Sequence, residues 1–230
     1  MPIRFLPLLA GLLPIVAIHA SLLLAINAGA IPACIPYLDG CASISATGRY
    51  EPAVYLFKPA MTTEAVVMVI YWSLSALWIR SMSQSAGVKA GPAVSITAIL
   101  GIAGAIALII YVTFLGTHAP FYEFMRRFGI YLYFLFTVVA QIFLARTALR
   151  SSETLGLESV VKVSRLQLWL SLTPFAFGTL NIILKSTLDN PDPAENIIEW
   201  VSALMMHAYF ALTYVSWRDT GFRADFTIKS

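Results

Sequence analysis

The sequence predicts an all-α membrane protein, a polytopic bundle of six transmembrane helices forming a single domain over residues 1–230. Two observations predict this class. Hydrophobic residues make up 59% of the chain and charged residues only 12%, whereas a soluble domain carries roughly 25% charged residues. The apolar residues are also gathered in windows of about 20 residues, the length that spans the hydrocarbon core of a bilayer. The windows are 5–28, 62–80, 93–116, 128–147, 166–185 and 196–217.

The first window admits two interpretations. Arg4, the following apolar run and the small residues at 28–30 resemble a secretory signal with a cleavage site. The apolar run is longer than the 7–15 residues typical of a signal sequence, and Pro14 and His19 interrupt it. We therefore expect a retained first span.

Helix-start signals precede the second and the sixth windows. Thr62 or Thr63 can cap a helix that has Glu64 in its first turn, where the helix dipole favours an anion. The run Asp192-Pro193-Ala194-Glu195 combines an N-cap residue, a proline at the first helical position and a capping-box glutamate. We expect ordinary helix-start roles for Glu64 and Glu195.

The basic residues predict the orientation. Two thirds of the 15 Lys and Arg residues fall on the side of the N-terminus if the windows alternate across the membrane. Short cytoplasmic loops carry such an excess of basic residues. Both termini are therefore expected in the cytoplasm, and the long loop between the first two helices is expected outside.

This first outer loop, residues 29–61, is too long to be a simple connector in a compact bundle. A short re-entrant or interfacial helix is expected around Pro52–Met61. Cys34 and Cys41 would face an oxidising compartment and can form a disulfide; the alternative is two free thiols in an interfacial segment. Two cysteines without nearby histidines make a poor zinc site, so neither a metal nor a cofactor is predicted.

Several short motifs together resemble those of a known membrane family. They lie in the first outer loop, in the loop after the third window, and at both ends of the last window: 43–48 (SISATG), Glu51-Pro52, Phe57, His118, Glu199-Trp200 and 214–219 (YVSWRD). In span number, loop pattern and motif order, the whole chain resembles the Frag/DRAM/Sfk family. It departs from that pattern where Glu51 precedes Pro52, because the family's order is proline before glutamate.

The resemblance implies a role with lipids. Some relatives take part in remodelling the lipid of GPI anchors, and others are linked to lipid asymmetry of the plasma membrane or to autophagy. We therefore expect a multi-pass protein, of a bacterial inner or plasma membrane or a eukaryotic endomembrane, that binds or remodels glycolipid or phospholipid at the extracytoplasmic leaflet. The alternative is a non-catalytic regulatory or interaction protein that affects lipid asymmetry or partner stability.

The expected partners are membrane lipids with anionic or glycolipid head groups. A net charge of +3 is too small to indicate a nucleic-acid partner. The sequence names no protein partner.

Polar residues on the outer side are the candidate site. Glu199 and His118 are the candidates for general acid and base. Candidates for lipid binding are Ser43, Ser45, Glu51, Arg126, Arg127, Trp200 and His19. Ser43 or Ser45 could also serve as a nucleophile, and the two arginines could hold a phosphate.

Each candidate also has a structural interpretation. Polar side chains commonly form hydrogen bonds between packed membrane helices, and arginines near span ends extend toward the interface. The serines lie in no G-x-S-x-G motif. Glu199 and His207, eight residues apart, are expected on one helix face.

Overall fold

The computed structural model describes residues 3–117 and 119–223, and within these ranges the chain is all-helical. A short 3-10 turn, Ile3–Phe5, leads into the first helix. Six long helices follow one another in antiparallel order, with two short helices in the first loop. Their bounds are α1 Leu6–Asn27, α2 Pro36–Asp39, α3 Ile44–Thr47, α4 Val54–Ser85, α5 Ala93–Thr113, α6 Pro120–Leu155, α7 Glu158–Thr187 and α8 Asp192–Asp219.

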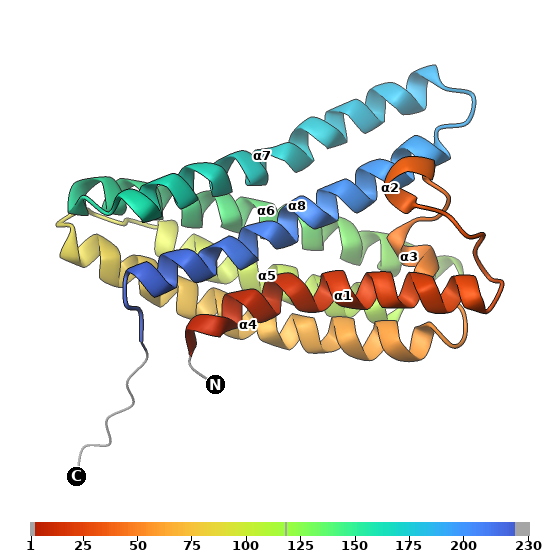
Figure 1. Ribbon diagram of the computed structural model, residues 1–230, viewed down its shortest axis with the longest axis horizontal. Helices are drawn as coiled ribbons and strands as arrows, with labels where there is room; N and C mark the ends of the chain where they lie inside the picture. The colour runs from red at the N-terminus through yellow and green to blue at the C-terminus, as the bar shows by residue number, and fades with distance from the viewer. Residues whose placement is uncertain (1–2, 118, 224–230) are drawn as a thin grey trace, which may run out of the picture.

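The six long helices form a closed ring of neighbours. Contacts follow the order α1, α4, α5, α6, α7 and α8, and α8 packs against α1 to close the ring. Because successive helices alternate in direction, both ends of the described chain lie at one end of the bundle (Figure 1). We call this end the terminus end and the opposite end, which carries α2 and α3, the loop end.

Five of the described helices are long and apolar enough to cross a membrane: α1 with its preceding turn, α4, α5, α6 and α7. The chain is thus an integral membrane protein by composition and fold. Helix α8 has 28 residues but is less apolar, since Asp192, Glu195 and Glu199 lie in its first third. The prediction of six spans is therefore supported for five helices, and α8 runs beside them as the sixth member of the ring.

Aromatic side chains fill the middle of the ring. Tyr71 and Trp72 of α4 pack on Phe210 of α8 with ring centroids 4.9 and 5.6 Å apart. The Tyr71 hydroxyl lies 2.9 Å from the hydroxyl of Thr213, to which Gln167 of α7 also donates at 2.8 Å. These contacts connect α4, α7 and α8 through the bundle interior.

The observed start of helix α4 shows that two sequence predictions are wrong. It begins at Val54, so residues 54–61, expected as part of a separate interfacial helix, are its first two turns. Glu64 therefore lies ten residues into the helix, not in its first turn, and its side chain is buried in the bundle. The helix-start role predicted for Glu64 is wrong, because hydropathy locates the apolar part of a helix and not its beginning.

Helix α7 leaves the bundle in its second half. Its buried residues end at Ser171, shortly before Pro174, and beyond that point it diverges from α6 and α8 toward the loop end (Figure 1). A proline inside a helix removes a backbone hydrogen bond and favours a bend. The divergence leaves apolar side chains of α6 and α8, such as Tyr131, Leu135 and Leu204, exposed at the side of the bundle.

Candidate functional site

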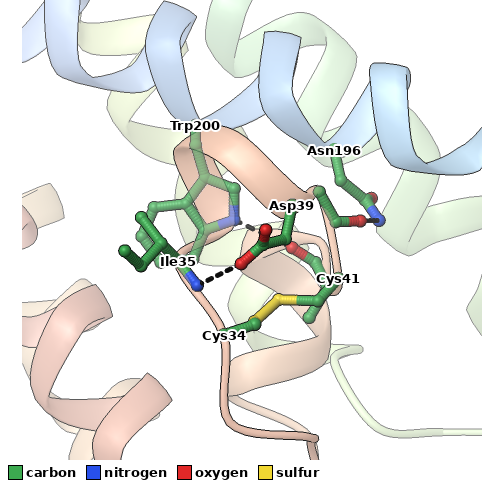
Figure 2. Close-up of a disulfide and its surroundings, with 8 residues drawn as sticks. Cys34, Ile35, Asp39, Cys41, Asn196 and Trp200 are labelled. Atoms are coloured by element: carbon green, nitrogen blue, oxygen red, sulfur yellow. Dashed lines mark hydrogen bonds between the residues drawn. A yellow bond between two sulfur atoms is a disulfide. The ribbon is translucent and has the colours of Figure 1, made fainter.

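The α2–α3 segment is attached to the start of α8 by hydrogen bonds and close packing. The Trp200 indole Nε1 donates to the Ala42 carbonyl at 2.9 Å, and the Asn196 amide donates to the Gly40 carbonyl at 2.7 Å (Figure 2). Gly40 has a φ of +58° and its Cα faces the backbone of Pro193 so closely that a Cβ would collide with it. Glycine adopts this left-handed conformation without steric cost. The segment therefore lies on α8 as a fixed cover over the loop end.

A disulfide closes the turn that contains α2. The structure joins Cys34 and Cys41, whose Cα atoms are 6.4 Å apart (Figure 2). Within this turn the Ile35 backbone N–H donates to the Asp39 carboxylate at 2.8 Å. The disulfide and this hydrogen bond fix the residues that precede Ala42, the acceptor for Trp200.

His19 and Trp200 contribute to this attachment. The His19 Nδ1 lies 2.7 Å from the Ile15 carbonyl, an acceptor only, so Nδ1 carries the proton and Nε2 accepts from the Tyr37 hydroxyl at 3.1 Å. Burial raises the pKa of Tyr37, which keeps its hydroxyl protonated as a donor. The rings of His19, Tyr37 and Trp200 pack together with centroids 5.3 to 5.8 Å apart. The geometry gives His19 and Trp200 roles in holding the loop.

Ser43 and Ser45 are engaged in local hydrogen bonds. Ser43 caps α3 by accepting from the Ala46 backbone N–H at 3.2 Å, and its hydroxyl lies 3.1 Å from that of Ser45. Ser45 in turn accepts from the Arg49 guanidinium at 2.7 Å. In this arrangement the two hydroxyls organise α3 and position Arg49.

Glu199 faces a small cavity beneath α3. Its carboxyl lies near the backbone N–H groups of Ile44 and Ser45, at the first turn of α3. The cavity has a volume of about 40 Å³, which is room for roughly three water molecules. Its walls come from five of the long helices and from α3: Pro14, Ile18, Ile44, Phe57, Met61, Leu108, Tyr111, Ile130, Tyr133, Phe134, Glu199, Ala203 and His207.

Arg49 and Arg126 lie near one another at this end of the bundle, where Arg49 also interacts with Glu199 and Arg126 with Glu123. The charges of Arg49 and Arg126 interact with each other, and both interact with Tyr111 in the cavity wall. Neither arginine forms an ion pair in the described part of the chain, and the Arg49 Nε is buried without a hydrogen-bond partner there. Two adjacent guanidinium groups without a paired carboxylate form an arrangement suited to a phosphate or carboxylate ligand. Arg127, the next residue, is exposed on the outside of α6.

A second histidine lies deeper in the cavity wall. His207 directs Nδ1 at the Ala203 carbonyl, 2.7 Å away, so its Nε2 is unprotonated and accepts from the Tyr133 hydroxyl at 3.3 Å. Glu199 and His207 thus line one cavity from one face of α8, as their spacing indicated. The cavity brings together a carboxyl, a histidine and two tyrosines.

Two other candidates lie apart from this group. Glu51 is exposed, and its carboxylate accepts from the Tyr55 hydroxyl at 2.5 Å. His118 falls outside the described residues. Within the described ranges no group of three or more metal-ligating side chains is present.

The sequence reasoning missed Arg49, Tyr111, Tyr133 and Glu64. Arg49 directly follows the SISATG motif, so its place beside Ser45 could have been found from the motif. Glu64 could have been found as an acidic residue in an otherwise apolar stretch, since such residues mark functional sites by default. The tyrosines lie in apolar windows where nothing in the sequence distinguishes them from interfacial aromatics.

An apolar bundle of long helices with a polar cluster at one end is the fold of a multi-pass membrane protein. The family model described as Frag1/DRAM/Sfk1/Cwh43P N-terminal domain matches residues 2–220. The chain belongs to this family, as the sequence motifs indicated. Comparison with curated proteins and with solved structures gave no match.

Proposed function

We propose that this protein binds the phosphate group of a phospholipid or glycolipid at the loop end of the bundle, in the extracytoplasmic leaflet. The observation that carries the proposal is the pair Arg49 and Arg126, which lie together beside the cavity without a carboxylate partner among residues 3–117 and 119–223. A lipid phosphate would contact both guanidinium groups directly, whereas Glu199 and Glu123 act on them from beyond ion-pair distance. Membership of the family supports a membrane role.

Exposed apolar side chains at the side of the bundle support a binding surface for the acyl chains of the lipid. Helix α7 diverges from α6 and α8 beyond Ser171 (Figure 1), and the side chains of Tyr131 and Leu135 on α6 are exposed there. Phe134 lines the cavity from α6, and Leu135 beside it is exposed. A lipid whose head group contacts Arg126 can lay its chains along this surface, while the 40 Å³ cavity holds only a small group or water.

We propose the membrane orientation from the charges. Arg80, Lys89, Arg150, Lys162 and Arg218 lie toward the terminus end, which supports a cytoplasmic location for that end and for both termini. With α8 as a sixth span, the loop end faces outside. A single cysteine placed at Asn190 in a Cys34→Ala/Cys41→Ala background should react with a membrane-impermeant thiol reagent from outside, and one placed at Gly156 should not. The reverse pattern would invert the orientation.

Remodelling and binding without turnover are two forms of this function. For remodelling, Glu199 would accept a proton from a water or hydroxyl in the cavity, which it lines. Binding alone is favoured by one observation: the Ser43 and Ser45 hydroxyls are occupied in capping α3 and in the bond from Arg49, so neither is set up as a nucleophile.

The experiment uses the purified full-length protein in nanodiscs with phospholipid carrying isotope-labelled acyl chains. Mass spectrometry of the lipids over time detects acyl hydrolysis or exchange, and native mass spectrometry of the protein detects bound lipid. The comparison is wild type, Glu199→Gln and the control Glu195→Gln, whose carboxylate pairs with Lys185 outside the cavity. Turnover lost only in Glu199→Gln supports remodelling. Retained lipid without turnover in all three leaves the binding form, and the absence of bound lipid in wild type overturns both.

A further inference from the structure

Glu64 is an acidic residue enclosed in the interior of the bundle. Its side chain has 0% exposed surface, and neither carboxyl oxygen has a hydrogen-bond partner among the described residues. An ionised carboxylate in such surroundings costs several kcal/mol unless a positive charge accompanies it. The cavity reaches Met61, one turn before Glu64 on α4, but Glu64 is not in its wall. The positive charge that can neutralise the enclosed Glu64 carboxylate is therefore a proton.

Tyr133 of α6 is the titratable group that interacts with Glu64. The two other helices that pack against α4, namely α1 and α5, each contain one titratable residue. His19 is the titratable residue of α1, and it bonds to Tyr37 and its own helix. Tyr111 is the titratable residue of α5, and it interacts with Glu199 and the arginines. Of these titratable groups, Tyr133 is the one with which Glu64 interacts electrostatically.

Tyr133 also contacts the cavity. Its hydroxyl donates to the unprotonated Nε2 of His207 at 3.3 Å, and both side chains line the cavity that contains Glu199. A hydroxyl that donates to one neighbour keeps lone pairs to accept from another. A hydrogen bond thus joins Tyr133 of α6 to His207 of α8, and Glu64 of α4 interacts electrostatically with Tyr133.

We propose that Glu64 is a proton-binding site in the membrane interior, and that its protonation is coupled through Tyr133 to His207 in the cavity wall. The inference goes beyond lipid binding and does not rest on it.

The test is infrared spectroscopy of the full-length protein in nanodiscs, because protonated and ionised carboxyl groups absorb at separate frequencies. In a Glu199→Gln background, which removes the other enclosed carboxyl, we expect a protonated-carboxyl band that persists above about pH 5, where exposed glutamates are ionised. Glu64→Gln should lose this band, and Glu195→Gln should keep it. No such band in the Glu199→Gln protein, or an unchanged band after Glu64→Gln is added, would overturn the assignment, and the first spectrum decides this even if the Glu64 variant does not fold.

The connection is tested with Tyr133→Phe. Loss of the hydroxyl should shift the frequency of the Glu64 band without removing it, and should change the ¹⁵N chemical shift of His207 Nε2 in labelled protein. Tyr131→Phe, an exposed tyrosine on the same helix, is the matched control. A Glu64 band that is identical in Tyr133→Phe and wild type would overturn the connection through Tyr133.

Discussion

The guanidinium groups of Arg49 and Arg126 lie near one another beside the cavity, and in the described part of the chain no carboxylate forms an ion pair with either. Arg49 comes from the loop and Arg126 from α6, so the fold holds two like charges together from distant parts of the sequence. Two positive charges held near one another repel, and this repulsion lowers the stability of the folded protein. A bound anion would remove that cost, and this relationship is the basis of the proposed lipid site.

Trp200 is expected to stabilise the loop through its indole N–H. Trp200→Phe keeps most of the buried ring but leaves the Ala42 carbonyl without its donor. We expect a loss of about 1–3 kcal/mol in the free energy of unfolding, measured by denaturation in detergent. Trp169→Phe is the control, because Trp169 is 72% exposed on α7. Equal stability of the two variants would show that this hydrogen bond contributes nothing.

Hydropathy predicted the apolar segments of the fold but not the full extent of the helices. Its windows found the apolar parts of all six long helices but missed the starts of α4, α6 and α7, which extend eight residues before their windows. Those extensions include Lys58, Arg126, Arg127 and Lys162, polar residues at which hydropathy falls although the backbone stays helical. The apolar part of each helix was therefore predictable, and its full length was not.

Only part of the candidate site was predictable from the sequence. Glu199 and Trp200 were recognised by their motif, and they do lie at the contact with the first loop. Glu64 was misassigned because its role depended on where α4 begins. The proximity of Arg49 to Arg126 depends on how α3 docks, which no local pattern encodes.

Gly40 is expected to be intolerant of any side chain. Gly40→Ala carries the cost of a left-handed alanine, about 1–2 kcal/mol, and a collision with the Pro193 backbone as well. Gly156→Ala has a similar φ of +68° with open space around it and so isolates the conformational cost. In thermal unfolding, Gly40→Ala should be the less stable of the two. Equal melting temperatures would mean that the loop does not pack on α8 in this way.

Gly129 is expected to set the distance between α5 and α6. A Cβ at this position would lie 2.6 Å from the Tyr111 backbone nitrogen, so Gly129→Ala should separate the helices and lower stability by about 1–3 kcal/mol. Gly178→Ala on α7 meets nothing within 4 Å and should gain up to about 1 kcal/mol from helix propensity. A loss of stability in Gly129→Ala together with a gain in Gly178→Ala would support the packing. A change in the same direction in both variants would contradict it.

The bond between Cys34 and Cys41 is expected to stabilise the loop through a short closed turn. Replacing both cysteines with alanine should lower stability by about 2–3 kcal/mol, the loop-closure estimate for a turn of this size. Alkylation of the unreduced wild-type protein followed by mass spectrometry should find no modified cysteine. Two alkylated cysteines would show free thiols, which would also count against an extracytoplasmic location of the loop end.

The lipid site is tested most directly by comparing two neighbouring arginines. Arg126→Gln and Arg127→Gln remove the same charge from adjacent positions of α6, but only Arg126 interacts with Arg49 and Tyr111. The measurement is the affinity of delipidated protein for an anionic phospholipid by native mass spectrometry. We predict that Arg126→Gln weakens binding about 10-fold or more, as expected for a lost charged hydrogen bond, while Arg127→Gln stays close to wild type. Equal weakening in both variants would show non-specific attraction to a basic surface, and no weakening in Arg126→Gln would contradict the proposed site.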